Sequence, residues 1–343
     1  MENIREKLES LRSVLLASEK EKLVLISTTA DVTNPSIIFG STRETKATIS
    51  VVIIIRDKSY IDEILNIFDG VADHFLIDCE NKNEAGSLVK DFFSKIKKSK
   101  AFIVKPNDFT VDSLDTFVAL LFGNLENKKV FVIGAGNIGS KITLRLCERG
   151  ADVFIFDKDL QKTQKIVEGL NLVKRSLSSV SSVSSLEVGA KGADLIIGCT
   201  PGIPIIGASI VQLMKADGKI IDAGNRTVMP EALSIARERG IEVLPLSSLG
   251  GHVGMIENWL FQRKNLEKPR IQTFGENSVI TPGTMGARGD MLVDDIEAPK
   301  RVFGVCDGVG GLLPKEEGLA LLREFVANNS GTGIISDIER LYQ

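Results

Sequence analysis

The sequence has few of the residues that would mark a disulfide framework, a metal site or a membrane span. It contains 4 Cys, 2 His and 1 Trp in 343 residues, and no two cysteines form a CxxC pair. This scarcity predicts reduced thiols and neither a disulfide framework nor a zinc site. The apolar runs, such as residues 51–55, are far shorter than the ~20 residues that cross a bilayer, and the N-terminal segment lacks a signal-peptide pattern. We therefore expect a cytoplasmic protein without a membrane partner.

An excess of positive charge is also lacking. The chain carries 42 Lys and Arg against 45 Asp and Glu, for a net charge of −3, and no basic tract interrupts this balance. A nucleic-acid partner is therefore not expected. With 43% hydrophobic and 25% charged residues the chain is typical of soluble globular proteins, and its length predicts roughly two domains at about 150 residues each.

Strand and helix patterns alternate along most of the chain. Short β-branched runs separated by amphipathic segments are typical of parallel βα units, so we predict an α/β fold. Its main part is expected to be a Rossmann doubly wound parallel sheet, preceded by a second, smaller α/β domain. Strands are expected at residues 23–27, 49–56, 74–78, 101–104, 130–133, 153–156, 195–198, 219–222 and 242–245.

Three regions follow from this pattern. We place an N-terminal substrate or lid domain at 1–108, a dinucleotide-binding domain with its linking helix at 109–265, and a glycine-rich extension at 266–343. The extension is expected to end in helices near 315–328 and 334–342 and to pack back on the N-terminal domain. A serine-dense piece at 176–185 is interpreted as a surface loop or a helix start.

A glycine motif follows directly on the expected strand 130–133. In Gly134-Ala-Gly-Asn-Ile-Gly139 the first glycine permits a tight turn, Gly136 lets the main chain approach a pyrophosphate, and the last lets helix and strand pack closely. The next strand ends in Asp157, 18 positions after Gly139, where a carboxylate can accept hydrogen bonds from an adenosine ribose. Strand, helix and acid together predict a nicotinamide dinucleotide site.

The same residues bear on the choice of cofactor. A carboxylate at Asp157 repels a 2′-phosphate, so NAD is favoured over NADP, although the adjacent Lys158 leaves room for the phosphate. Small or polar residues also end the two following strands, and for Thr200 and Gly224 a role as mere connecting turns is an equal alternative. The predicted cofactor-binding residues are Gly134, Ala135, Gly136, Asn137, Ile138, Gly139, Asp157, Lys158, Cys199, Thr200, Pro201, Gly224 and Asn225.

Several segments carry a resemblance to a known group of enzymes. They are the glycine motif, Ile221-Asp-Ala-Gly-Asn225, Gly250-Gly-His-Val-Gly-Met255 and Pro106-Asn-Asp-Phe-Thr110. Over residues 105–262 the chain resembles two-domain dehydrogenases with an amino-acid-dehydrogenase-like N-terminal domain, the group that includes shikimate dehydrogenases and methylenetetrahydrofolate dehydrogenases. The resemblance implies an NAD(P)-dependent dehydrogenase, with a homodimer as a further expectation.

The resemblance also implies catalytic candidates. Folate enzymes carry a Lys four residues after a Tyr, whereas here Tyr60 is followed by Ile64, which argues against folate chemistry. Shikimate dehydrogenases pair a first-domain Lys with an Asp at the start of the linking helix, which points to Lys46 and Asp108, although the order Asn-Asp-Phe-Thr departs from the usual Asn-Thr-Asp. His252 lies near the expected nicotinamide pocket and is the third candidate. The alternative for Lys46 is a solvated loop cation and for Asp108 a helix cap. For His252 the alternative is a hydrogen-bonded structural residue in a glycine-rich turn.

These observations favour one function over two others. Polar residues at 28–36 and 41–43 are expected to face a substrate, and Arg43 can pair with a carboxylate or phosphate. The leading hypothesis is an NAD-dependent oxidoreductase that transfers a hydride to or from a small polar metabolite in the cleft between the domains. The alternatives are an NAD(H)-binding regulatory protein without turnover, and a Rossmann enzyme that uses NAD catalytically for elimination or cyclisation.

Overall fold

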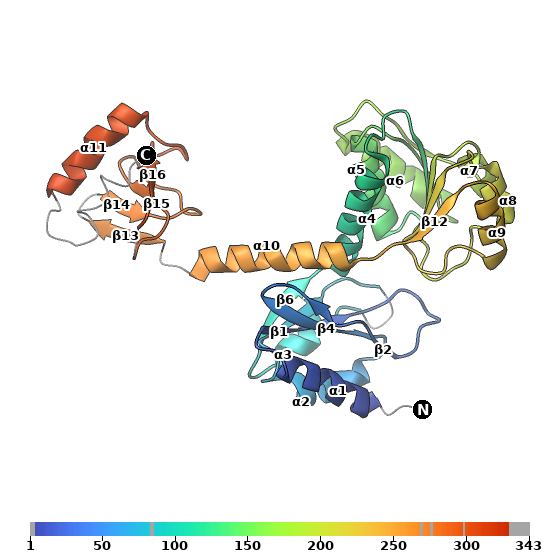
Figure 1. Cartoon of the computed structure of the whole chain (residues 1–343), viewed down its shortest axis with the longest axis horizontal. Coiled ribbons are helices and arrows are strands. Elements are labelled where there is room, and N and C mark those ends of the chain that lie inside the picture. Colours follow the sequence, from blue (N-terminus) through green and yellow to red (C-terminus); the bar gives the residue numbers. More distant parts are fainter. Residues whose placement is uncertain (1–3, 83–85, 268–269, 275–276, 298, 329–343) are drawn as a thin grey trace. The chain divides into compact units, whose positions relative to one another are not determined.

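The computed structural model describes residues 4–82, 86–267, 270–274, 277–297 and 299–328. Its internal contacts divide the chain into two units, Met1–Gly254 and Met255–Gln343. Two mainly parallel sheets lie in the first unit and a four-stranded sheet lies in the second (Figure 1). The predicted α/β class is confirmed.

The first sheet belongs to the N-terminal part of the chain. Its strands are β1 (Glu21–Ser27), β2 (Ile37–Phe39), β3 (Arg43–Glu44), β4 (Thr48–Ile55), β5 (His74–Asp78) and β6 (Lys100–Val104). Its helices are α1 (Ile4–Leu16), η1 (Lys58–Tyr60), α2 (Ile61–Phe68) and α3 (Val89–Lys95). The order is β2-β4-β1-β5-β6, in which β1, β4, β5 and β6 run parallel and the short β2 and β3 pair antiparallel with β4.

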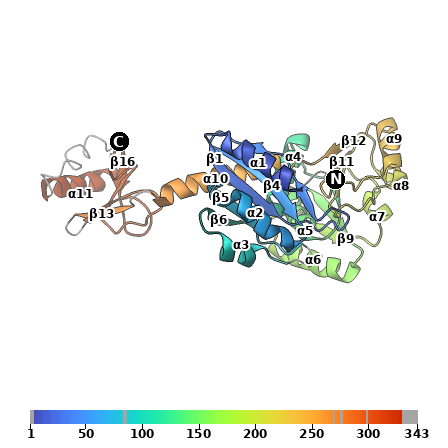
Figure 2. The ribbon, with the colours of Figure 1, turned by 90° about the horizontal axis from the view of Figure 1, so that it is seen from below.

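The two faces of this sheet have different roles. Because side chains alternate along a strand, Val24 and Ile26 of β1 pack on one face into the core formed with α1, α2 and α3. Figure 2 shows these helices lying along the sheet. Leu25, Val52 and Ile54 point to the other face, where they line a cavity. One face therefore stabilises the domain and the other faces a site.

The second sheet has the predicted doubly wound topology. Its strands are β7 (Lys129–Ile133), β8 (Asp152–Phe156), β9 (Val180–Ser182), β10 (Leu195–Gly198), β11 (Lys219–Asp222) and β12 (Glu242–Pro245). They are all parallel, in the order β12-β11-β10-β7-β8-β9. This is the strand order of the Rossmann fold, in which ligands bind where the order reverses, beside β7.

Helices cover both faces of the second sheet. These helices are α4 (Pro106–Phe122), α5 (Asn137–Glu148), α6 (Leu160–Val173), α7 (Leu186–Ala190), α8 (Ala208–Leu213) and α9 (Pro230–Glu238). One core joins α4, α5 and α6 to the sheet, and the other joins α7, α8 and α9 (Figure 1).

Ion pairs connect the linking helix α4 to α5, the helix that follows the glycine motif. Arg145 pairs with Asp112 at 2.7 Å, and Arg149 donates to both carboxylate oxygens of Asp115 at 2.6 and 2.9 Å. The spacing of three and four residues places these side chains on one face of each helix. These ion pairs fix how the two helices are aligned along their apolar contact.

The last elements begin with a helix that crosses the boundary at Gly254, and the elements after it belong to the second unit. They are α10 (Leu249–Glu267), β13 (Ile271–Phe274), β14 (Asn277–Ile280), β15 (Met291–Val293), β16 (Val302–Val305) and α11 (Lys315–Asn328). Val279, Met291 and Val305 pack with Leu322 and Phe325 of α11. The helix expected at 315–328 is confirmed, whereas the one expected at 334–342 lies outside the described residues. The packing of the extension on the N-terminal domain and the boundaries at 108 and 265 stay predictions.

Three local interpretations change. The serine-dense piece contains the edge strand β9, and only its end matches the expected helix start, where the Ser185 hydroxyl accepts a hydrogen bond from Val188 N–H. The segment 249–255 is helical and not a glycine-rich turn, because α10 begins at Leu249. The glycine-rich extension carries a small sheet.

No helix in the described part of the chain is long and apolar enough to span a membrane.

Candidate active site

The glycine motif has the geometry that its spacing predicts. Gly134 has φ +108°, in the region that favours glycine, and a Cβ at Gly139 would lie 1.8 Å from the Gly134 carbonyl oxygen. A Cβ at Gly136 would meet no atom within 4 Å. The main chain at Gly136 therefore borders open space at the N-terminus of α5, which is where a pyrophosphate can approach backbone N–H groups.

Asp157 follows β8 and supports the motif directly. One of its carboxylate oxygens accepts a hydrogen bond from Ala135 N–H at 2.8 Å, and the other accepts one from Asp159 N–H at 3.3 Å. The side chain is half-buried and Lys158 is exposed. Because each carboxylate oxygen has two lone pairs, Asp157 keeps acceptor capacity for a ligand while it holds the loop.

The loops after β10 and β11 pack closely against the motif. A Cβ at Gly134 would lie 3.1 Å from the Cys199 carbonyl group, and one at Gly224 would lie 2.0 Å from the Thr200 carbonyl oxygen. The burial of the Cys199 thiol, together with the Asp222 carboxylate, raises its pKa to about 12, so this thiol is not a nucleophile at neutral pH. These loops present main chain and small side chains, which suits a flat ring ligand.

A cavity of about 440 Å³ lies beside these loops. It is bordered by the second face of the first sheet, by the start of α4 and by the glycine motif with the following strand ends. Of the predicted cofactor residues, it is lined by Gly136, Asn137, Ile138, Cys199, Pro201, Gly224 and Asn225. The polar lining from the other elements is Ser27, Thr28, Thr29, Arg43, Asn81, Lys82, Asn107, Thr110 and Ser248.

A buried lysine stands on the first-sheet side of this cavity. Lys82, with only 10% of its side chain exposed, contacts the Asp78 carboxylate at 2.7 Å and the Glu80 carboxylate at 3.1 Å. Asp78 is fully buried at the end of β5 and also accepts from the Ser27 hydroxyl at 2.7 Å and from Thr28 N–H at 3.1 Å. The ammonium group is therefore held in one place by two carboxylates that are themselves fixed.

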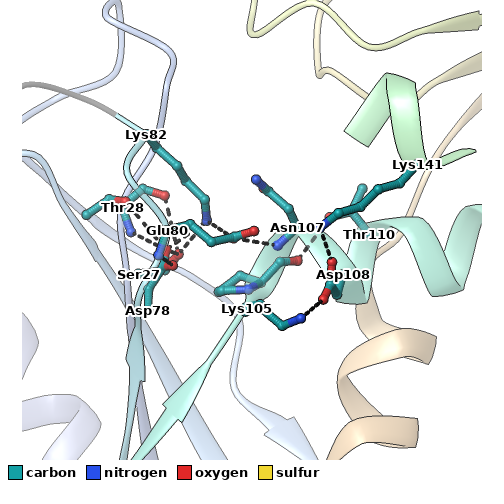
Figure 3. A network of polar contacts seen from close by, with 11 residues as sticks. Ser27, Thr28, Asp78, Glu80, Lys82, Lys105, Asn107, Asp108, Thr110 and Lys141 are labelled. Atoms are coloured by element: carbon teal, nitrogen blue, oxygen red, sulfur yellow. Dashed lines mark hydrogen bonds and ion pairs between the residues drawn. The ribbon is translucent and has the colours of Figure 1, made fainter. Parts of the chain in front are cut away.

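The lysine cluster is connected to the linking helix. Glu80 accepts a hydrogen bond from Asn107 N–H at 2.9 Å, in the first turn of α4. Figure 3 shows that Lys82 and Glu80, in the segment after β5, face Asn107 at the start of α4. A carboxylate at a helix N-terminus satisfies a free N–H group and interacts favourably with the helix dipole. Glu80 thus ties the position of Lys82 to the helix that leads into the Rossmann domain.

The structure does not bring Lys46 and Asp108 together. Lys46 is exposed in the turn before β4, whereas the cavity lies at the carboxyl half of that strand. Asp108 instead pairs with Lys141 of α5 and with Lys105 at 2.7 Å (Figure 3). Although burial raises the pKa of Asp108, the two lysines hold it below its ordinary value. The expected Lys46–Asp108 pair is therefore corrected: the lysine at the cavity is Lys82.

His252 lies behind the cavity and does not line it. Its side chain is fully buried in the first turns of α10, its ring meets Phe109 edge to face at 5.7 Å, and neither ring nitrogen has a hydrogen-bond partner in the described structure. Burial, together with the charge of Arg43, lowers its pKa to about 4, so the imidazole is neutral at pH 7. The expectation of a hydrogen-bonded turn histidine is corrected, and direct proton transfer from His252 to a ligand in the cavity has no contact to support it.

A polar contact joins the two sheets at the edge of the cavity. Arg226, after β11, pairs with Asp31, after β1, and also donates to the Thr33 hydroxyl at 2.9 Å. Hydrogen bonds from Thr33 lower the pKa of Asp31. Asn225 and Arg226 both have φ 60°, a conformation with a steric cost for side chains. The contact holds a strained loop that carries part of the cavity wall.

Sequence reasoning missed Lys82, Asp78 and Glu80. A signal was present, because the predicted strand 74–78 ends in Asp78 and is followed by the polar run Cys-Glu-Asn-Lys. Ligands of parallel sheets bind at the carboxyl ends of strands, so the residues after this strand are site candidates in the same way as those after the other strands. The choice of Lys46 followed the resemblance by position and not this rule.

Comparison with known proteins gives a family match for part of the chain. Residues 117–232 match the family model described as Shikimate / quinate 5-dehydrogenase. The predicted resemblance to NAD(P)-dependent dehydrogenases is thereby confirmed for this domain. The matching segment runs from α4 to α9 and includes the glycine motif and Asp157.

Individual relatives match shorter parts or match weakly. A glutamyl-tRNA reductase of Exiguobacterium sibiricum is 35% identical over 86 residues, 25% of this chain and 18% of that protein. A phenylalanine dehydrogenase of Bacillus thermotolerans is 24% identical over 177 residues, 47% of this chain and 45% of that protein. Among solved structures, shikimate dehydrogenase from Aquifex aeolicus is 14% identical with a TM-score of 0.45, covering 71% of this chain and 93% of that one. The chain spans less than half the length of these two curated relatives.

Proposed function

We propose that the chain is a nicotinamide-dependent oxidoreductase that transfers a hydride between the cofactor and a small polar metabolite. The observation that carries the proposal is the position and pairing of Lys82. This lysine is buried, doubly paired and presented to a cavity whose opposite wall is the glycine motif and the strand ends of the Rossmann sheet. A cavity of about 440 Å³ is in the range of small-molecule sites.

The residues on the Rossmann side fit a dinucleotide. Gly136 leaves open space beside the first turn of α5, and Asp157 keeps acceptor capacity at the end of β8. We infer that Gly136, Asn137 and Ile138 hold the pyrophosphate and that Cys199, Pro201 and Gly224 border the nicotinamide. When bound, the nicotinamide supplies the hydride acceptor or donor.

The chain itself must handle the proton that accompanies the hydride. In the reductive direction Lys82 Nζ donates a proton to the carbonyl oxygen or imine nitrogen of the metabolite, and in the oxidative direction it takes the proton back. Asp78 and Glu80 orient the ammonium group through contacts at 2.7 and 3.1 Å. The hydroxyl and amide groups of Thr28, Asn107 and Thr110 in the same wall can orient the metabolite.

We further propose that NAD is preferred over NADP. The carboxylate of Asp157 lies where the adenosine ribose is expected, and it repels a 2′-phosphate. Calorimetric titration with NAD, NADH, NADP and NADPH tests this. The expected result is tighter binding of NAD(H) and a smaller preference in Asp157→Asn; equal affinity for both cofactors would contradict the inference.

The activity is tested with two matched lysine variants. The purified chain is screened with small hydroxy, amino and keto acids for absorbance changes of the nicotinamide. Lys82→Met should lose nearly all turnover and keep its cofactor affinity, since general acid–base catalysis contributes typically about 10²–10⁴-fold. Lys46→Met, with an exposed lysine outside the cavity, should keep full turnover.

Four outcomes would separate the proposal from its alternatives. Loss of turnover in Lys46→Met and not in Lys82→Met would restore the Lys46 hypothesis. Cofactor binding with no turnover of any tested compound would favour a regulatory protein, and a product without net oxidation would favour catalytic use of NAD. Absence of binding to all four cofactor forms would refute the proposal.

A further inference from the structure

Arg43 differs from Lys82, the other cation of the cavity, because the residues that the structure describes give it no counter-ion. It lies at the start of β3, is half-buried and lines the cavity. It donates a hydrogen bond to the Ser248 hydroxyl at 3.5 Å, which is at the outer limit for such a contact. Among residues 4–82, 86–267, 270–274, 277–297 and 299–328, no carboxylate pairs with it, and the neighbouring Glu44 is taken by Lys20 at 2.7 Å.

The other cation of the cavity differs in this respect. Lys82 contacts two carboxylates, Asp78 and Glu80, so its charge is more than balanced by the protein. A partly buried guanidinium without a counter-ion is costly, because burial removes water and no opposite charge replaces it. Burial accordingly lowers the pKa of Arg43 below its ordinary value. The cavity therefore has one charge that a ligand is left to balance.

The residue behind Arg43 does not balance it either. His252 is fully buried, both of its ring nitrogens are without partners in the described part of the chain, and its imidazole is neutral. Arg43 is the charged group that acts on it. The positive charge of Arg43 therefore acts on a neutral imidazole, and an anion in the cavity would balance that charge.

We propose that Arg43 is the specificity-determining residue of this site and binds an anionic group, a carboxylate or a phosphate, on the substrate. The inference rests on the proposed function for the identity of the reaction but not for the anion site itself. A guanidinium can form two parallel hydrogen bonds to either group, which fixes orientation as well as charge. The anionic end then lies at Arg43, and the reacting carbon faces Lys82 and the strand ends.

The chain carries a natural reporter for this anion. It has only two histidines, His74 and His252, so histidine-labelled protein gives two sets of imidazole signals in an NMR spectrum, and His74→Asn assigns them. An anion at Arg43 offsets the positive charge that acts on His252. The His252 signals should therefore move, and its pKa should rise toward the ordinary value of a histidine.

The probes are glycolate, inorganic phosphate and the neutral isostere glycolamide, added to the full chain with saturating cofactor and, in parallel, to the chain alone. We expect glycolate or phosphate to shift the His252 signals and glycolamide to leave them unchanged. In Arg43→Met the apparent affinity for the anion should fall by about tenfold or more, since the variant removes charge-assisted hydrogen bonds to it. Arg43→Lys should retain part of the affinity, and unchanged cofactor binding shows that each variant is folded.

The response distinguishes the two sources of the anion. A shift with glycolate alone assigns a carboxylate, and a shift with phosphate alone assigns a phosphate ester. The proposal would be overturned if neither anion shifts the His252 signals, or if the shift in Arg43→Met equals that in wild type. Because the titration is also run without cofactor, an Arg43-dependent shift in a chain that binds no cofactor would sustain the anion site while refuting the oxidoreductase.

Discussion

The neutral, buried His252 makes the stability of the first unit depend on pH in a defined window. In the unfolded chain an imidazole titrates near pH 6.5, whereas in the folded chain burial and then the charge of Arg43 lower the pKa of His252 to about 4. Between these values the unfolded state binds more protons than the folded state, so stability rises with pH. The contribution is complete above about pH 6.5 and is lost as the pH falls toward 4.

The size of this contribution follows from the two pKa values. The interval from 6.5 to about 4 corresponds to about 3 kcal/mol, at about 1.4 kcal/mol per pKa unit. Since whole domains are stable by about 5–15 kcal/mol, this is a measurable fraction. Carboxyl groups with lowered pKa values, such as Asp31 and Asp108, add most of their own losses below their ordinary value of 3.8. The difference between wild type and a His252 variant above pH 4 therefore reports on His252 itself.

The assay is urea unfolding of wild type and His252→Phe at pH 7 and pH 4.5. Far-UV circular dichroism follows the transition, because the single tryptophan, Trp259, belongs to the second unit. Between the two pH values wild type should lose about 2–3 kcal/mol more than the variant, because phenylalanine can pack on Phe109 without titrating. His252→Leu serves if the larger ring does not fit.

The same pH dependence in wild type and in both variants would refute the reasoning. It would mean that the imidazole is hydrated or hydrogen-bonded in the folded protein and not desolvated.

Two further predictions concern packing and the loop at the edge of the cavity. Gly139→Ala should destabilise the chain by about 1–3 kcal/mol or more in thermal unfolding and weaken cofactor binding, since the new Cβ would lie 1.8 Å from the Gly134 carbonyl oxygen. Gly169→Ala is its control, because a Cβ at Gly169 would meet no atom within 4 Å, and alanine in a helix should stabilise the chain by about 0.5–1 kcal/mol. A Gly139→Ala variant more stable than Gly169→Ala would contradict this packing. Arg226→Ala should speed amide hydrogen exchange at residues 223–227 while costing only about 1 kcal/mol, because the Arg226 side chain is 61% exposed and Asp31 keeps other donors. A loss of several kcal/mol, or unchanged exchange, would show that the contact does not hold the loop.

Local sequence determines the Rossmann domain almost completely. The predicted strands at 195–198, 219–222 and 242–245 match β10, β11 and β12, and the glycine motif occupies the turn that its spacing requires. Local prediction succeeds here because parallel strands that are buried on both faces appear in the sequence as continuous apolar runs. It also succeeds because only glycine fits a left-handed or closely packed backbone position. Where the pattern is short and polar, as at β9, local sequence does not distinguish an edge strand from a loop.

The site depended on contacts between residues far apart in the chain. Sequence alone identified Arg43, Asp108 and His252 as candidates, but it could not say that Asp108 pairs with Lys141 or that Lys82 is the lysine at the cavity. Burial and charge pairing arise only when strands and helices from both sheets pack. Local residues therefore determined where a dinucleotide is expected to bind. The tertiary structure alone decided which cation of the cavity is paired with carboxylates and which has none among the described residues, because desolvation and Coulomb energies depend on three-dimensional neighbours.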